Sequence, residues 1–354
     1  MTHAFWTNRP QHDPQTGRTV QSQSLTQYIF DEIRQLLPGD KSLAKELAMV
    51  LNIGESAVYK KLRGDNPLTL DEAAALAQHF HFSLDNYLLP QKGVVPMTFY
   101  PLVEQTNDPL DFLRRLLANI EIATRLPASS LHYATVEIPV FHYLHFPELT
   151  AFKLFVWGRS TWELDEQGVD FHPETLAVSE EMNYLRTRIL HCYYRWPSTE
   201  FWTLHMLDNT LSQIRYFTDQ HIFRDNTFPA RLFAQIGQLL EHQQKMAASG
   251  RKHPPGQKPQ RDAGAFRLFH NEIAPTGNTF LVQSADKNAV YFTFDNPDFF
   301  QTSNLTFVAY AQKWFDRLLK RSTPLSGAAE RQRVLFFKTL EKRMKDWSKS
   351  AAKR

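Results

Sequence analysis

Three cationic side chains and one tyrosine gather within five consecutive residues, at positions that a short helix would turn toward solvent. They are Tyr59, Lys60, Lys61 and Arg63. Val58 and Leu62, four residues apart, mark the opposite and buried side of the same helix. Cations on the outward side of such a helix can contact DNA phosphates, and their donors can reach base edges in the major groove. The cluster therefore predicts a helix that binds double-stranded DNA.

The residues before this cluster fit the same chemistry. The first turn of the helix would present three side chains to base edges, namely Glu55, Ser56 and Ala57. The start of the preceding helix would bind the phosphate backbone through charge and free amide groups, and its residues for this role are Lys41, Ser42 and Lys45. Together with the cluster, these residues form the candidate DNA-contacting set.

Two short helices and a tight turn must position this set. Ala44, Leu47, Ala48 and Leu51 give the first helix one apolar stripe, and the sequence Asn52-Ile53-Gly54 ends it. Gly54 or Ser56 can cap the second helix, and Gly64 stops it, as glycine commonly does after a helix. A helix pair of this kind is typical of proteins that place side chains in a major groove.

The segment resembles the DNA-binding domain of Cro/C1-type, lambda-repressor-like transcription regulators. The matching residues are Leu47-Ala48, Leu51-Asn52-Ile53, Ser56, Val58, Gly64, the helix Leu70 to Phe80, and Phe82-Ser83-Leu84-Asp85 at a fifth helix. The likeness covers Leu25 to Leu89. It departs from the family at Ala44, where glutamine often contacts phosphate, and at Glu55, where a basic or neutral residue is commoner. The resemblance implies a five-helix domain and a DNA-binding transcription regulator.

Two other classes of function remain open. A small helical bundle shows the same apolar spacing, so the helix pair could serve as the contact module of a protein-interaction adaptor that does not bind DNA. A third and weaker hypothesis is an enzyme fused to such a domain. The salt dependence of DNA binding separates the first two, and a metabolite or metal retained during purification would favour the third.

No motif of enzyme chemistry supports the third hypothesis. The sequence contains no CxxC, HxxxH or HExxH metal pattern, and no GxSxG, GxxxxGK[ST] or GxGxxG motif. Six histidines could suggest a metal, but we interpret them as polar edges of aromatic clusters: His79, His81, His132, His142, His145 and His191. We therefore expect no catalytic residue, no metal and no cofactor, and we expect that the protein is not an enzyme.

Aromatic residues are dense on two neighbouring predicted helices, 173–196 and 198–219, the second of which is predicted from apolar residues that recur every three or four positions from Phe201 onward. The aromatic residues are Tyr184, Tyr193, Tyr194, Trp196, Phe201, Trp202, Tyr216 and Phe217. Such helices could line an apolar pocket for a small-molecule effector, although aromatic stripes more often form core. Four charged residues could orient a ligand carboxylate or could form surface ion pairs, namely Glu137, Arg186, Arg188 and Arg195.

Bulk properties favour a folded cytoplasmic protein. The chain has 354 residues, 42% of them hydrophobic, and a single cysteine, Cys192, which excludes an internal disulfide and suits a reducing compartment. No run reaches the roughly 20 apolar residues of a membrane span, and Met1 to Ser24 lacks the apolar stretch of a signal peptide. The net charge is +3, yet residues 331–354 hold nine Lys/Arg and two acids. Such a basic helix is more often solvated than bound to phosphate.

We predict a mainly α fold with four parts. A polar segment, 1–23, precedes the DNA-binding domain, 24–89, and a linker, 90–107. The remainder, 108–354, is predicted as an α-rich sensor or assembly domain with a flexible loop at 249–263. It is predicted to begin with an amphipathic helix that is capped at Asp108 and ends at Leu126. Three β-rich segments, 266–273, 279–284 and 289–294, indicate a small antiparallel meander in this domain.

The larger region also resembles, more loosely, the C-terminal region of a group of bacterial regulators built in two parts. The likeness lies in Val136 to Trp157, Asn271-Glu272, Asn278-Thr279 and Ser322 to Phe337. It implies a sensing or assembly role without a known ligand. Because one helix pair contacts only a short half-site, we expect a homodimer, and the helix Ser326 to Trp347 is the candidate partner-facing element.

Overall fold

A computed structural model describes residues 24–37, 42–80, 82, 84, 87, 94–99, 108–166, 168–169, 171–273 and 277–351. The chain divides into two compact units, Met1–Val94 and Val95–Arg354. The expected polar segment 1–23 lies outside the described residues, as do most of the linker 90–107 and most of the fifth helix. Among the described residues, no helix is long and apolar enough to cross a membrane.

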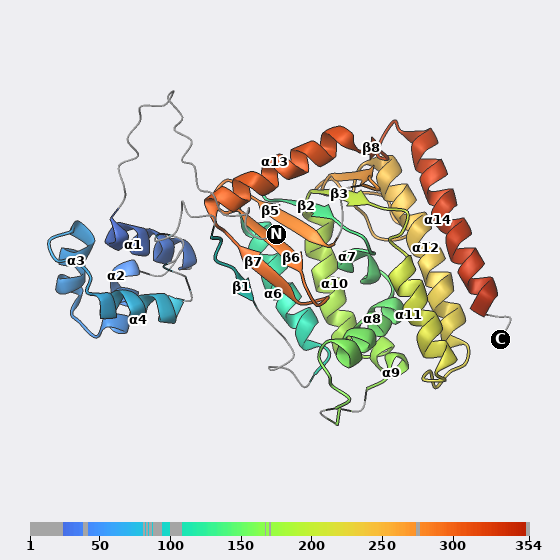
Figure 1. Ribbon diagram of the computed structural model, residues 1–354, viewed down its shortest axis with the longest axis horizontal. Coiled ribbons are helices and arrows are strands. Elements are labelled where there is room, and N and C mark those ends of the chain that lie inside the picture. Colours follow the sequence, from blue (N-terminus) through green and yellow to red (C-terminus); the bar gives the residue numbers. More distant parts are fainter. Residues whose placement is uncertain are drawn as a thin grey trace, which may run out of the picture. The chain divides into compact units, whose positions relative to one another are not determined.

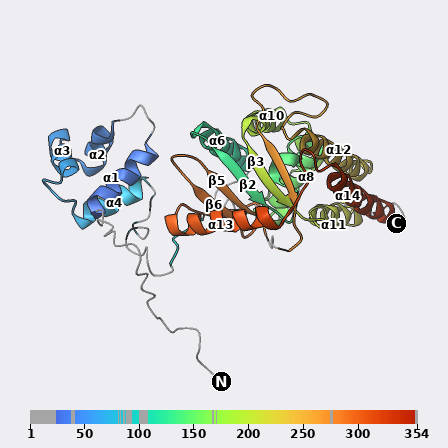
Figure 2. The ribbon, with the colours of Figure 1, turned by 90° about the horizontal axis from the view of Figure 1, so that it is seen from above.

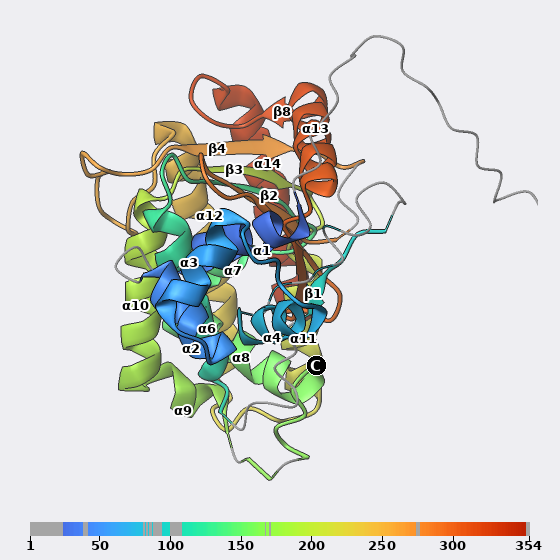
Figure 3. The same ribbon diagram turned by 90° about the vertical axis from the view of Figure 1, so that its left-hand side faces the viewer.

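The small unit contains four described helices around one core (Figure 3). They are α1 Leu25–Leu36, α2 Leu43–Leu51, α3 Glu55–Arg63 and α4 Leu70–Phe80. Apolar residues at three- and four-residue spacing meet in that core: Ile29, Phe30, Ile33, Ala44, Leu47, Val58, Ala73 and Leu76. Thr69 and Glu72 form a reciprocal capping box at the start of α4, in which each side chain accepts a bond from the other residue's backbone N–H.

The described part of the large unit contains nine helices and one eight-stranded sheet; Figure 1 shows their arrangement. The helices are α6 Asp111–Arg125, α7 Val140–Tyr143, α8 Pro147–Ser160, α9 Pro173–Ala177, α10 Glu180–Arg195, α11 Asp208–Asp219, α12 Phe228–Ser249, α13 Leu305–Arg321 and α14 Glu330–Ala351. A turn at Asp108, whose side chain accepts a hydrogen bond from the Leu110 backbone N–H, precedes α6. The strands are β1 Thr98–Phe99, β2 Ser130–Ala134, β3 Ser198–Trp202, β4 Phe266–His270, β5 Thr279–Gln283, β6 Ala289–Thr293, β7 Phe299–Thr302 and β8 Thr323–Pro324.

The sheet order is β1-β7-β6-β5-β2-β3-β4-β8. The pairs β2/β3 and β3/β4 are parallel, and the other pairs are antiparallel. Ala134 of β2 lies opposite Phe201 of β3, and Phe201 lies opposite Phe269 of β4, so these strands share one register at the centre of the sheet.

This sheet overturns the prediction of a mainly α unit with a small antiparallel meander. The chain from Ser198 was predicted to be helical because apolar residues recur from Phe201 onward at helical spacing, yet Ser198–Trp202 forms β3. All five residues of β3 are buried, so this central strand lacks the alternation that identifies a half-exposed strand. Of the predicted meander, β5 and β6 pair in antiparallel fashion, but β4 does not pair with β5, because β2 and β3 lie between them.

The sheet is the middle of three layers (Figure 2). Helix α13 covers one face, where Val308, Ala311 and Phe315 pack against strand residues such as Phe201 and Leu281. The opposite face carries α6, α8, α10 and α12, whose apolar side chains form two larger cores. The large unit therefore has an interior deep enough to hold buried polar groups and a cavity.

The structure also bears on two further expectations, the flexible loop at 249–263 and the helix proposed to face a partner. Segment 249–263, expected as a flexible loop, is tied to the body, since Lys252 N–H donates to Gly264 O and the Arg251 guanidinium donates to the carbonyls of Arg261 and Ala263. Helix α14, the candidate dimer element, packs against α12 and α11 of its own unit. Met344 and Trp347 contribute to that packing, so the apolar stripe that suggested a partner is used internally.

Candidate nucleic-acid interface

Helices α2 and α3 form the helix-turn-helix that the sequence predicts locally. Asn52 ends α2 in the left-handed conformation at φ 51°, and its backbone N–H bonds back to the carbonyls of Ala48 and Met49. Gly54 in extended conformation begins α3, and Gly64 at φ 84° ends it. Asparagine and glycine tolerate positive φ better than other residues, which explains why the chain turns at these points.

One side of α3 is anchored in the small core. The Val58 side chain is 1% exposed, and Leu62 is partly buried against the same core. Because residues four apart lie on one face of a helix, this anchoring determines which α3 residues face outward. The exposed α3 residues are Glu55, Ser56, Tyr59, Lys60 and Arg63, while Ala57 is half-buried.

The outward face offers two cations and an aromatic ring. Lys60 is exposed, and Tyr59 keeps 50% of its surface in solvent. The Arg63 side chain is 66% exposed, and its Nε lies 3.1 Å from an Asp65 carboxylate oxygen. An exposed pair of this kind is weak and can be exchanged for a phosphate at little cost.

Lys61 does not belong to this face, contrary to the sequence prediction. Its side chain is only 11% exposed, and its Nζ lies 2.9 Å from a Glu72 carboxylate oxygen and 3.1 Å from the Pro67 carbonyl oxygen. Burial alone would raise the pKa of Glu72, but the hydrogen bonds from Lys61 and Thr69 and the charge of Lys61 lower it. Lys61 therefore joins α3 to α4, and the sequence signal that could have indicated this was the Thr69-x-x-Glu72 capping box.

The start of α2 supplies the candidate phosphate contacts. Ser42 is the N-cap residue and is exposed, and its side chain makes no capping bond to α2. Lys45, one turn into the helix, is exposed as well, whereas Lys41 lies outside the described residues. Ala44 is 4% exposed and belongs to the core, which explains why this position does not carry a polar phosphate ligand.

The small unit has no net positive charge, and the cations that could bind phosphate are a few individual side chains. Residues 24–89 contain six Lys/Arg and nine Asp/Glu, so the segment as a whole carries a net charge of −3. Two of the three cations of α3 remain on its outward face. Attraction to phosphate must therefore come from the placement of a few side chains and not from the net charge of the domain.

The aromatic and charged residues singled out in the large region do not all meet at one site, although Arg186, Tyr194 and Arg195 line a common pocket. Tyr193, Phe201 and Trp202 are fully buried in the core, while Tyr184 and Tyr216 are exposed. The four charged residues are dispersed among separate partners. Glu137 lies 3.8 Å from Lys153, Arg188 pairs with Glu121, Arg195 pairs with Asp262, and Arg186 binds Asn183 and the Leu144 carbonyl.

A different polar group lies in the interior of the large unit. The fully buried Glu200 carboxylate accepts hydrogen bonds from His142 Nε2 at 2.8 Å, Tyr193 OH at 2.7 Å, Ser198 Oγ at 3.1 Å and Trp202 Nε1 at 3.1 Å. Burial alone would raise the pKa of Glu200, but the charge and hydrogen bond of His142 and the charge of Lys252 lower it to about 2. The carboxylate is fully satisfied, which is the pattern of a structural anchor.

Histidines in this interior contact aromatic rings, as expected from the sequence. The His142 ring lies 5.2 Å from that of Trp202, and the His145 ring lies 4.8 Å from that of His242. Burial lowers the pKa of His145 and His242 and holds both rings neutral. In the part of the chain that the structure describes, no group of three or more His, Cys, Asp or Glu side chains is placed to hold a metal ion.

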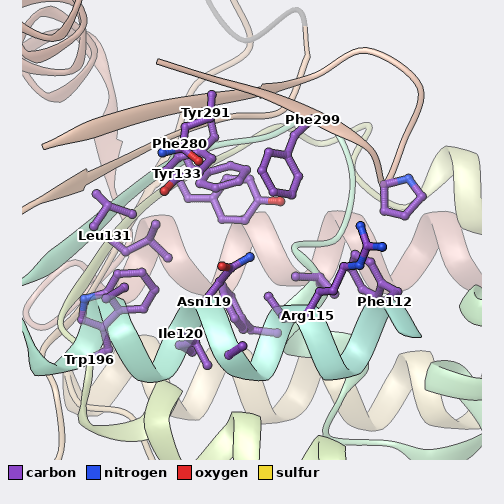
Figure 4. A pocket seen from close by; sticks show the side chains of 18 of the residues that line it. Phe112, Arg115, Asn119, Ile120, Leu131, Tyr133, Trp196, Phe280, Tyr291 and Phe299 are labelled. Carbon is purple, nitrogen blue, oxygen red and sulfur yellow. The ribbon is translucent and has the colours of Figure 1, made fainter. Parts of the chain in front are cut away.

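A cavity of about 390 Å³ opens inside the large unit between α6 and the strands β2, β5, β6 and β7 (Figure 4). Tyr133, Phe280 and Tyr291 line it from the sheet, and Asn119 and Ile120 line it from α6. Of the aromatic residues expected around a pocket, Trp196 alone is among its lining residues. The other walls come from segments distant in sequence, which sequence reasoning could not bring together.

Comparison with known proteins gives one similarity. Residues 24–129 match the family model of the BetR domain. The match begins at the N-cap of α1, includes the helix-turn-helix, and extends through α6 of the large unit. No curated protein and no solved structure matches the chain.

Proposed function

We propose that the protein is a DNA-binding transcription regulator whose α3 enters the major groove. The observation that carries the proposal is the geometry of α2, the turn and α3. Val58 and Leu62 anchor one side of α3, and Tyr59, Lys60 and Arg63 stand on the other. A short exposed helix with two cations and a ring can contact both phosphates and base edges.

Two further features support the proposal. Ser42 and Lys45 lie at the exposed start of α2, where uncapped backbone N–H groups favour an anion. The match to the BetR domain model over residues 24–129 suggests a regulatory role for the segment that contains the helix-turn-helix. In this proposal the large unit senses a signal or builds a dimer, and the protein acts in the cytoplasm.

The regulator is proposed to act as a homodimer on a palindromic target. One recognition helix reads only a short half-site, and related helix-turn-helix proteins pair two half-sites roughly 34–36 Å apart. Because the apolar stripe of α14 is used within its own unit, the dimer would need another surface. Light scattering at micromolar protein should give twice the chain mass of 41.2 kDa.

Selection of bound sequences from a random duplex pool, followed by salt titration, tests DNA binding. The double variant Lys60→Ala/Arg63→Ala should bind the selected duplex more weakly. Its log–log salt slope should flatten by about 1.8 for each bound subunit, or about 3.6 for the homodimer, since each phosphate contact contributes about 0.9. The double variant Lys313→Ala/Lys320→Ala removes the same charge from exposed positions on α13 and should leave the slope unchanged. Parent-like binding by the α3 variant at every salt concentration would contradict the groove assignment.

The net charge of −3 over residues 24–89 favours one alternative, a protein-interaction adaptor that does not bind DNA. The same titration separates the two functions. An adaptor would select no sequence and would show no saturable, salt-dependent binding to duplex DNA, whereas a regulator would show both.

A further inference from the structure

The cavity beneath the sheet has the size and construction of a ligand site. Its volume of about 390 Å³ falls in the range of small-molecule pockets, roughly 300–1,000 Å³. Its walls are largely apolar, and it is open to solvent on the side of α6, where Asn119 is exposed.

Aromatic rings hold the sheet side of the cavity open. The rings of Phe280 and Tyr291 stack with centroids 4.7 Å apart and an interplanar angle of 7°. Tyr133 packs against Phe280 at 5.4 Å, and Phe299 packs against Tyr291 at 5.5 Å. These contacts link β2, β5, β6 and β7, so the wall is preformed and need not be ordered when a ligand binds.

The two ends of the cavity differ in chemistry (Figure 4). Trp196 and Leu131 lie at one end with Ile120. Arg115 lies toward the other end, and Asn119 stands between the two ends on α6. Asp298 and Gln301 also line the space. From position 115 to position 123 the helix rises about 12 Å, so the cavity is elongated along α6.

We infer that this cavity binds a small, elongated and largely apolar molecule that contains aromatic rings and one polar group. Its rings would lie between α6 and the stacked wall of Phe280 and Tyr291, where offset or edge contacts with aromatic side chains are favourable. Its polar group would lie toward Asn119 and Arg115, which can donate hydrogen bonds there. Ligand pockets usually combine mostly apolar walls with a few polar groups, and these polar groups orient the ligand.

Ligand binding is independent of the proposed DNA contact, because every lining residue belongs to the large unit. Only the further role of the ligand as an effector rests on the proposed function. A titration without DNA therefore tests the cavity even if the small unit proves to be an adaptor.

The probe is N-phenyl-1-naphthylamine, which has two aromatic ring systems joined by one N–H and fluoresces strongly in apolar surroundings. The full chain should bind it with one-to-one saturation. Ala123→Phe fills the apolar end of the cavity and should weaken binding at least tenfold. Ile122→Phe adds a similar ring at the neighbouring position of α6, which is 62% exposed and does not line the cavity, so it is the matched control.

Asn119→Trp provides a second block at an exposed lining position, where a larger side chain is tolerated without repacking the core. It should also weaken binding at least tenfold while the melting temperature stays at the parent value. Saturable binding that falls in both cavity variants and persists in Ile122→Phe supports the site. Absence of saturable binding by the folded parent, or parent-like affinity in Asn119→Trp, would overturn it.

Discussion

Lys61 Nζ lies 2.9 Å from a carboxylate oxygen of Glu72, and this ion pair joins α3 to α4. The neighbouring Lys60 is exposed. Two adjacent lysines thus have different tasks, because successive helix residues are rotated by about 100° around the axis. Lys61 holds α3 against α4, and Lys60 lies on the face that we propose to contact DNA phosphates.

Lys60→Met and Lys61→Met form a matched pair that tests this division. Lys60→Met should flatten the log–log salt slope of DNA binding by about 0.9 per bound subunit and leave the unfolding free energy unchanged. Lys61→Met should leave the slope unchanged and lower the unfolding free energy by about 0.5–1.5 kcal/mol, since it removes a largely buried hydrogen-bonded pair. Urea unfolding and fluorescence anisotropy measure the two quantities. Equal changes of slope in both variants would refute the division of roles.

Acid should destabilise the large unit through Glu200. The pKa of this carboxyl is lowered to about 2 in the folded protein, from an ordinary value of about 4.5. A lowered pKa contributes stability that is fully present above pH about 4.5 and is lost as the pH falls toward 2. We expect a loss of up to about 3 kcal/mol across this interval from this one group.

Glu200→Gln removes the titrating group and keeps the side-chain shape, so its unfolding free energy should be lower at pH 6 and should vary less between pH 4.5 and pH 2.5. Glu180→Gln, at an exposed position of α10, is the control and should keep the parent's acid dependence. If urea unfolding gives Glu200→Gln and the parent the same pH profile, Glu200 does not carry the acid sensitivity.

Gly264 allows segment 249–264 to approach the end of α10. A Cβ atom at this position would lie 2.8–2.9 Å from backbone atoms of Arg195 and Trp196, and backbone cannot move aside easily. We expect Gly264→Ala to lower the melting temperature. Gly237 in α12 is the matched control, because its Cβ would make only ordinary contact with Met344 at 3.7 Å. Gly237→Ala should be neutral or stabilising by up to about 1 kcal/mol, since alanine favours a helix. Equal effects on thermal unfolding would disprove the close approach.

Helix α14 should stabilise its own unit rather than hold a dimer. Met344 packs on the core together with Trp347, whereas Leu335 on the same helix is 68% exposed. Met344→Ala should therefore cost about 1–3 kcal/mol of unfolding free energy, and Leu335→Ala should stay within about 0.5 kcal/mol of the parent. Urea unfolding measures both, and light scattering should show the parent's mass for Met344→Ala. A lower mass without lost stability would return α14 to the role of an interface.

Local sequence signals predicted the helix-turn-helix because each depends on residues close together in the chain. The apolar positions of α2, the break at Asn52 and Gly54, and the stop at Gly64 all act within one or two turns. Helix α6 was predicted in the same way, from an apolar stripe that begins after Asp108. Such signals also indicated which side of α3 carries Val58, and hence that Tyr59 and Lys60 face outward.

Contacts between distant segments decided the rest. Strands β2, β3 and β4 are joined in parallel through connections that contain whole helices, and a fully buried strand such as β3 shows no alternation to reveal it. Lys61 faces inward because Glu72, eleven residues later, lies within reach of it. The cavity needs Asn119 of α6 and Tyr291 of β6 on opposite walls. Spacing along the chain predicted helices such as α2 and α3 and their apolar sides, because those signals are local. The pairing of strands and the assembly of the cavity walls depend on packing between distant segments, which no short stretch of sequence contains.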